Sequence, residues 1–194
     1  MPYSLSAQYN LETGDATAEI STKDLDPFSL VQMPPLTDPL KKIKGLRITT
    51  DASASVNIKT MDYEWRAKGG LFLPYGIIPS SENITFNLSG NKHNIRISSL
   101  NAEGSMIGAS FSGNFNLARL QPTGVLELRH FTLPNGAEFS GDIYVDAAGN
   151  SYTIFSPQLN VGDVSLTALQ AEASISTASA YRVIHFIFFI YFVF

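Results

Sequence analysis

Apolar and polar residues alternate with a period of two along most of this 194-residue chain. Such alternation is typical of a β-strand with one buried face, because successive side chains of a strand point to opposite sides of the sheet. It is clearest in eight runs, at residues 46–49, 56–59, 61–68, 84–89, 95–97, 111–117, 126–129 and 139–145. Weaker alternation at residues 3–9, 16–22, 152–155 and 161–166 predicts further strands.

Short turn sequences separate these runs. Residues 89–92 (SGNK), 134–136 (PNG) and 148–150 (AGN) are rich in Asn and Gly, which tolerate positive φ. Strands joined by such short turns pair antiparallel, whereas a parallel pair needs a long crossover. The sequence therefore predicts an all-β fold, an antiparallel meander that forms an elongated curled sheet or groove, with a β-sandwich as the alternative.

Two segments interrupt the alternation. Residues 23–45 contain four prolines, and strand pairing does not survive that proline density. Within this segment, Asp38 and Pro39 suit a helix start and Gly45 suits a helix end, so we expect one short helix over residues 39–44. Residues 69–79 (GGLFLPYGIIP) form a second interruption that is unusually apolar for a loop.

The C-terminal tail, from Val183 to Phe194, reads VIHFIFFIYFVF. As a helix, these twelve residues would span about 18 Å. A helix that crosses a bilayer needs roughly 20 residues, so the tail is too short to cross as a helix. Three interpretations stay open: a membrane-associated segment, a buried strand, and a truncated or out-of-frame end. The low-complexity stretch 171–180 (AEASISTASA) separates the tail from the predicted sheet.

Composition excludes several classes of function. The chain has no cysteine, so it has neither a disulfide framework nor a thiolate zinc site. Its three histidines, His93, His130 and His185, are too few and too scattered in sequence to indicate a metal site. A net charge of −4 does not favour nucleic acid as a partner. With no catalytic motif in the sequence, we expect a protein that is not an enzyme and that carries no cofactor.

One group of residues nevertheless deserves a chemical interpretation. Asp62 and Glu64 lie near Trp65, and paired carboxylates beside an aromatic ring are typical of sugar sites. They alternate with Arg66 and Lys68, however, as residues of a solvated strand face do. A surface or adhesive β-sandwich that binds carbohydrate through Trp65, Asp62 and Glu64 is therefore the alternative function.

A long sheet that is apolar on one side either fills a sandwich core or keeps its apolar face open for lipid. Exposing a sixteen-carbon chain to water costs on the order of 13 kcal/mol at about 0.8 kcal/mol per CH₂, so lipid transport needs a continuous apolar lining. The candidate lining residues are Val56, Ile58, Tyr63, Trp65, Ile84, Phe86, Leu88, Ile95, Ile97, Phe111, Phe115, Leu117, Leu126, Leu128, Phe139, Ile143 and Val145.

Two stretches carry a family resemblance. DLDPFSLVQMPPLTDPLKKIKGLRITTDASASVNI resembles the inter-repeat linker and first strands of AsmA-like proteins, a superfamily that includes the TamB translocation and assembly module. SLNAEGSMIGASFSGNFNLARLQPTGVLELRHFTLPNGAEFSGDIYVD is similar to their repeats, in which a glycine-punctuated strand precedes G-x-L-x-L. The resemblance implies an elongated β-groove that carries phospholipid between the inner and outer membranes of diderm bacteria, with a part in outer-membrane protein assembly for some members.

On this basis we expect a fragment of a longer, membrane-associated protein on the periplasmic side of the bacterial envelope. Its expected divisions are residues 1–22, the end of a preceding β-repeat; 23–45, a proline-rich linker; 46–170, the groove or sandwich; and 171–194, a linker and the apolar tail. The expected partners are phospholipid acyl chains, a membrane contacted by Val183 to Phe194, and outer-membrane assembly proteins, but no nucleic acid.

Overall fold

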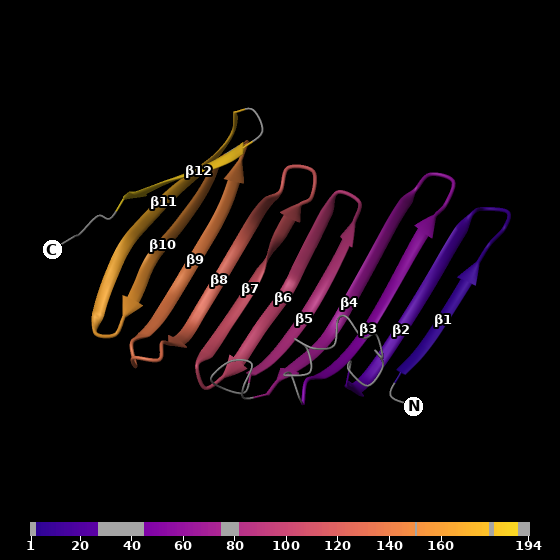
Figure 1. Cartoon of the computed structure of the whole chain (residues 1–194), viewed down its shortest axis with the longest axis horizontal. Helices are drawn as coiled ribbons and strands as arrows, with labels where there is room; N and C mark the ends of the chain where they lie inside the picture. Colours follow the sequence, from indigo (N-terminus) through magenta and orange to yellow (C-terminus); the bar gives the residue numbers. More distant parts are fainter. Residues whose placement is uncertain (1–2, 27–44, 75–81, 150, 179–180, 190–194) are drawn as a thin grey trace.

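The computed structural model describes residues 3–26, 45–74, 82–149, 151–178 and 181–189. They form one antiparallel sheet in which the strands lie side by side in the order of the sequence (Figure 1). The strands are β1 (Tyr3–Tyr9), β2 (Asp15–Leu25), β3 (Arg47–Asn57), β4 (Asp62–Leu73), β5 (Glu82–Asn91), β6 (Asn94–Gly104), β7 (Ile107–Asn116), β8 (Gln121–Thr132), β9 (Glu138–Ala148), β10 (Ser151–Val161), β11 (Val164–Ala178) and β12 (Tyr181–Phe189).

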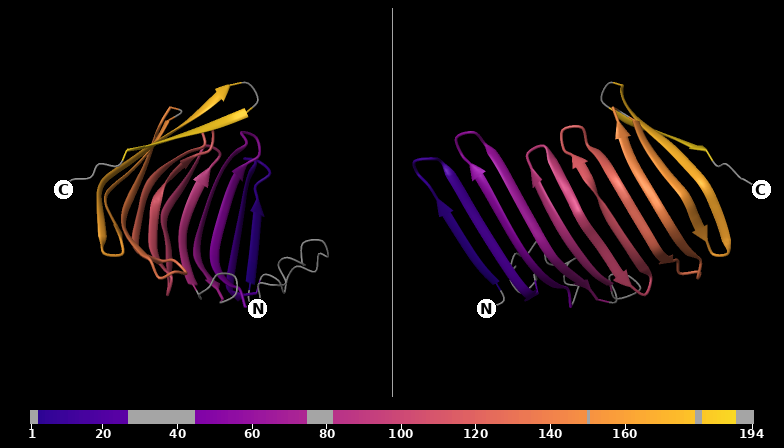
Figure 2. Two further views of the ribbon diagram at one scale, coloured as in Figure 1. Left: turned by 60° about the vertical axis from the view of Figure 1, so that its left-hand side comes forward. Right: turned by 180° about the vertical axis from the view of Figure 1, so that it is seen from behind.

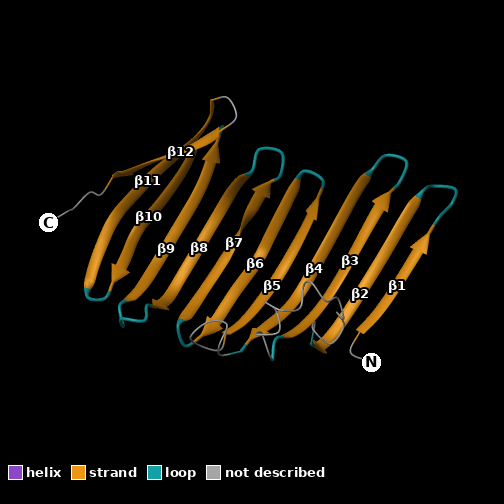
Figure 3. Cartoon of the chain, in the orientation of Figure 1, coloured by secondary structure: helices purple, strands orange, loops and turns teal. Residues whose placement is uncertain are grey.

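The predicted all-β antiparallel meander is confirmed. Every regular element among the described residues is a strand (Figure 3), and the helix expected over residues 39–44 lies outside the described ranges. The strands form a single layer, so the described part of the chain does not adopt the two packed sheets of the sandwich alternative. The strands are bowed along their length, and β11 and β12 bend away from the plane of the others (Figure 2).

Three predicted strand boundaries were wrong. The strand expected at residues 161–166 spans the turn at Gly162 and Asp163, between β10 and β11. The runs at 46–49 and 56–59 belong to the single strand β3, because residues 50–55 (TDASAS) also alternate, with Thr50, Ala52 and Ala54 on one face. These side chains are small, and their weak hydrophobicity hides the period. The expected interruption at 69–79 also begins too early, since β4 continues through both glycines to Leu73.

Asparagines shape the turns at one rim of the sheet, the upper rim in Figure 1. The side-chain oxygens of Asn10, Asn57 and Asn91 each accept hydrogen bonds from the backbone N–H groups two and three residues later, at 2.8–3.2 Å. Asn116 accepts one from the N–H three residues later, at 2.9 Å. These turns follow β1, β3, β5 and β7, so the same asparagine hydrogen bonds form the turn of four successive hairpins. The turn predicted at 89–92 is accordingly shifted to Lys92 and His93.

Bulges keep the apolar residues on one face where the alternation slips. Between β5 and β6, Phe86 is opposite Leu100 and Leu88 is opposite Ile97, so β6 carries one extra residue. A similar irregularity lies between Phe155 and Leu159 of β10, around Pro157, where proline leaves the ladder without an N–H donor. Without such bulges, every later side chain of the strand would change face.

The expected domain boundaries fall within this continuous sheet. β2 pairs with β3 over most of its length, which joins residues 15–25 to the sheet that begins at residue 47. β11 runs through residue 170 without a break, and β12, in the tail segment, pairs with β11 from Gln170 to Ala178.

Candidate functional site: an uncovered apolar face

One face of the sheet carries rows of apolar residues that run across the strands. The central row consists of residues that are directly opposite one another from β1 to β11: Leu5, Ile20, Ala52, Ala67, Leu88, Ile97, Gly113, Gly124, Val145, Ile154 and Ala171. Adjacent strands are about 4.8 Å apart, so this row is about 48 Å long. It contains no polar side chain.

Two flanking rows extend this apolar face. On one side lie Ala7, Ala18, Ala54, Trp65, Gly90, Ile95, Phe115 and Pro122. On the other side lie Tyr3, Thr22, Thr50, Gly69, Phe86, Leu100, Phe111, Leu126 and Ile143. The polar groups in these rows are the hydroxyls of Tyr3 and the two threonines and the indole N–H of Trp65, and none of the three rows contains a charged side chain.

The register places the predicted lining residues together on this face. Val56 is opposite Tyr63, Ile84 is opposite Leu71, and Phe139 is opposite Phe131, with ring centroids 6.4 Å apart in the last pair. Ile58 and Leu117 lie in turns just beyond the ends of β3 and β7. The prediction omitted the contribution of β1 and β2 and the small residues of β3 and β4; the alternation of Ala with Ser or Thr was the signal that could have revealed it.

Glycines on this face accommodate large rings from neighbouring positions. A Cβ placed on Gly90 would lie 2.8 Å from the indole of Trp65, which is directly opposite on β4. The ring of Phe111 covers the Gly113–Gly124 pair, and its Cζ would lie 3.0 and 2.9 Å from Cβ atoms placed there. Aromatic rings therefore fill the space that the missing side chains leave.

The apolar face has no covering layer among the described residues. Leu25, which is 7% exposed, is the only apolar side chain in these ranges that is nearly fully buried. Other apolar residues of this face, such as Leu5 (71% exposed), Tyr9 (53%) and Ile20 (42%), keep much of their surface in contact with solvent. Soluble proteins seldom leave so large an apolar patch open unless it binds something.

The face is hollowed near its N-terminal end. A depression with a volume of about 450 Å³ is lined mainly by Ala7, Tyr9, Ala16, Ala18, Ala54, Val56 and Ile58. Four of these residues are alanines, so the floor lies close to the backbone and the larger side chains stand at its border.

One ionisable side chain lies at the rim of the apolar face. Glu82, at the start of β5, is 1% exposed, and a Cβ on the opposing Gly104 would overlap its carboxylate. The ring of His130 lies over Gly108, and its Nε2 is 3.1 Å from the carbonyl oxygen of Gly104. These contacts give His130 a structural role at the end of β6.

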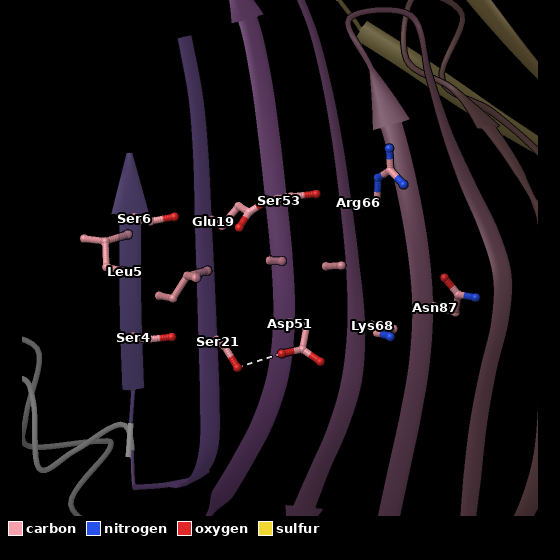
Figure 4. A pocket seen from close by; sticks show the side chains of 13 residues that line it. Ser4, Leu5, Ser6, Glu19, Ser21, Asp51, Ser53, Arg66, Lys68 and Asn87 are labelled. Carbon is pink, nitrogen blue, oxygen red and sulfur yellow. Dashed lines mark hydrogen bonds between the residues drawn. The ribbon is translucent and has the colours of Figure 1, made fainter. Parts of the chain in front are cut away.

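The opposite face is polar. A depression of about 380 Å³ there is lined by polar and charged residues together with the intervening Leu5, Ile20, Ala52 and Ala67 (Figure 4). The polar and charged residues are Ser4, Ser6, Glu19, Ser21, Asp51, Ser53, Arg66, Lys68 and Asn87. Ser21 Oγ donates a hydrogen bond of 2.6 Å to Asp51 Oδ1 across β2 and β3. Its mixed charges and exposed hydroxyls are typical of a solvated sheet surface.

Exposed carboxylates at the hairpin ends are stabilised in their charged form. The Lys92 ammonium, which donates a hydrogen bond to Asp62, and the Thr60 side chain together lower the pKa of the Asp62 carboxyl. Hydrogen bonds from Thr13 and from Asn57, whose Nδ2 is 2.7 Å from Asp15 Oδ1, lower the pKa of Asp15. The Asp62–Lys92 and Asp15–Asn57 pairs each link two neighbouring hairpins at the rim of the sheet where the asparagine turns lie.

The predicted carbohydrate trio is divided between the two faces. Trp65 is opposite Ala54 and Gly90 on the apolar face, whereas Asp62 and Glu64, at alternate positions, point to the polar face. The indole and the two carboxylates therefore do not line one binding surface.

No cluster of three or more His, Cys, Asp or Glu side chains that could hold a metal ion occurs within the described ranges. None of the described segments is a helix long and apolar enough to cross a membrane. Comparisons with protein-family models, curated proteins and solved structures find nothing that matches this chain.

Proposed function

We propose that this chain is a non-enzymatic segment of a bacterial envelope protein that conducts phospholipid along an apolar β-groove. The observation that carries the proposal is the open, uncharged central row, which crosses eleven strands without a polar side chain. An acyl chain lying along this row would be shielded from water along its whole length on the side that contacts the sheet. At about 0.8 kcal/mol per fully buried CH₂, that contact offsets part of the cost of leaving a bilayer.

The polar face supports the same proposal. It lets the sheet stay hydrated on one side while lipid covers the other, which is the arrangement expected of a trough between two membranes. The resemblance to AsmA-like proteins suggests a periplasmic location and outer-membrane assembly proteins as further partners. Both are part of the proposal.

The single tryptophan offers a direct test. Trp65 lies on the apolar face, so phospholipids with brominated acyl chains should quench its fluorescence when they bind. The matched control carries Trp65→Phe and Phe72→Trp, which moves the tryptophan along β4 to the polar face, where Phe72 is 37% exposed. Strong quenching in the natural chain and weak quenching in the control are expected; equal quenching, or none in either, would refute the proposal.

Transfer itself is tested by placing a charge in the row of Phe86 or Phe115. Phe86→Asp and Phe115→Asp should each stop transfer of a fluorescent phospholipid between vesicles, because a carboxylate interrupts the apolar lining. Circular dichroism should show that the strands persist. Photo-crosslinkers at the same two positions should capture lipid, and consistent failure to capture it would contradict the proposal. A glycan array tests the carbohydrate alternative independently.

A further inference from the structure

Exposed aromatic residues interrupt the polar face over β8, β9 and β10, which lie side by side (Figure 1). Val125, Tyr144 and Phe155 are directly opposite one another on these three strands. Val145, next to Tyr144, belongs to the central apolar row, so Tyr144 and its two partners point to the other side of the sheet. Tyr144 is 41% exposed and Phe155 is 39% exposed, and their ring centroids are 6.3 Å apart. Aromatic side chains are enriched where proteins contact each other, so two adjacent open rings on a hydrated face indicate a contact surface.

Carboxylates border these rings on both sides. Asp142 and Asp146 lie two residues before and two residues after Tyr144 on β9, on the same face, and both are exposed. Glu127 of β8 is directly opposite Asp142, so two like charges face each other across a strand pair, with Cβ atoms about 4.5–5.5 Å apart. Like charges in directly opposite positions destabilise a sheet, and a cation placed between them would remove that repulsion.

The described part of the chain supplies no such cation. Within it, neither Glu127, Asp142 nor Asp146 forms a salt bridge, and Arg129, two residues along β8 from Glu127, is paired with Glu103 of β6. The imbalance extends along the sequence. Residues 1–129 contain twelve Lys or Arg and twelve Asp or Glu, whereas residues 130–181 contain five Asp or Glu and no Lys or Arg. The charge that is missing at this end of the sheet is therefore positive.

We infer that this surface docks a basic, extended segment of a partner protein. The acidic aromatic patch, as we name it, consists of Val125, Glu127, Asp142, Tyr144, Asp146 and Phe155. A guanidinium group can bind a carboxylate through two hydrogen bonds and can also stack on an aromatic ring, so arginine suits both parts of the patch. The negative charge disfavours an anionic phospholipid surface as the occupant. The patch lies on the face opposite to the apolar rows, so its role does not depend on lipid transport.

The spacing of the patch specifies the sequence pattern of the segment. Asp142 and Asp146 are four residues apart, about 13 Å along β9, with the ring of Tyr144 between them. An extended segment that runs along β9 presents every second side chain to the sheet. Cations at positions i and i+4 then meet the two carboxylates, and an apolar residue at i+2 meets the rings.

Two dye-labelled peptides of the same composition test this pattern. GRSLSRG has its arginines four residues apart with leucine midway, whereas GSRRLSG has them side by side, so that they point in opposite directions in an extended segment. Fluorescence anisotropy with the full chain at low ionic strength should show tighter binding of GRSLSRG. Added salt should weaken that binding, because exposed charges are screened.

Replacing one ring tests the aromatic part. Phe155→Ser should weaken the binding of GRSLSRG by roughly two- to fivefold, as expected for loss of an exposed cation–π contact. Phe72→Ser is the matched control, because Phe72 lies on the same face and is 37% exposed but belongs to the distant strand β4. It should leave the binding unchanged.

Replacing one carboxylate separates a binding role from a structural one. Asp142→Asn should weaken the binding of GRSLSRG by roughly two- to fivefold, as expected for loss of an exposed ion pair. The same change should raise the urea midpoint of the free chain, because it removes the repulsion from Glu127. A carboxylate with a merely structural role would instead lower the midpoint when replaced. Glu64→Gln, at an exposed position of β4 on the same face, should change neither quantity.

Tighter binding of GRSLSRG that Phe155→Ser and Asp142→Asn both weaken, with both controls unchanged, supports the inference. No binding of GRSLSRG, equal binding of the two peptides, or equal losses in Phe155→Ser and Phe72→Ser overturns it. Binding of neutral oligosaccharides on a glycan array that Phe155→Ser abolishes would assign the patch to carbohydrate and would also overturn it. Quenching of Trp65 by brominated phospholipid is measured on the Asp142→Asn chain as well, so failure of the patch is distinguished from failure of the groove.

Discussion

Truncation of Phe86 measures whether the apolar face is open or covered. Phe86 lies in the middle of the sheet, between Gly69 on β4 and Leu100 on β6, and is half-buried. Gly69 supplies no side chain, Leu100 is itself 36% exposed, and no second layer of described strands lies over the ring. Phe86→Ala therefore removes a contact on a surface and leaves no closed cavity.

The magnitude follows from this geometry. Complete burial of a phenylalanine side chain contributes roughly 1.5–3 kcal/mol, and truncation to alanine in a closed core costs about 3–5 kcal/mol, because an empty cavity adds to the loss. On an open face the ring realises only part of the transfer free energy, and water occupies the vacated space. We expect Phe86→Ala to lower the free energy of unfolding by about 1 kcal/mol.

The assay is equilibrium unfolding in guanidinium chloride, followed by circular dichroism, without lipid. Leu5→Ala is the control: its side chain is 71% exposed, and its truncation should change the free energy of unfolding by less than about 0.5 kcal/mol. Added phospholipid should stabilise the natural chain more than Phe86→Ala, because ligand binding to the folded state raises its stability. A loss of 3 kcal/mol or more without lipid would show that the face is covered, and the open-face argument would be wrong.

Three further predictions concern local features. The pKa of Asp62, measured by NMR, should be below its ordinary value and should rise in Lys92→Met; the stabilisation it gives is present above the ordinary pKa and is lost as the pH falls through the lowered one. Gly113→Ala should destabilise the chain by about 1–3 kcal/mol in denaturant unfolding, because its Cβ would overlap a backbone carbonyl of β8, whereas Gly70→Ala, whose nearest neighbour would be 3.5 Å away, should be nearly neutral. Deletion of residues 183–194 should leave the β3–β9 sheet intact and raise soluble yield, since β11 is the only described strand with which β12 pairs; loss of the cooperative thermal transition would contradict this.

The sequence by itself determined the strand content and which residues share a face. Alternation is a local property, because a period of two places every second side chain on the same side whatever the strand pairs with. Phe111 and Phe115, four residues apart on one strand, could therefore be assigned to one face from their spacing alone. The Asn and Gly turns were also local signals, and they predicted an antiparallel meander because a short turn returns the chain beside itself.

Only the tertiary structure decided the register, the continuity of the rows and the absence of a second layer. Whether Leu88 meets Ile97 depends on the bulge in β6, which arises from pairing between strands. The strand over residues 50–55 escaped prediction because alanine and serine differ too little in hydrophobicity to reveal a face until their neighbours are placed. An alternating strand has the same sequence pattern whether a sandwich partner or a ligand covers it. For that reason the open apolar face could be recognised only once all the described strands lay in one sheet.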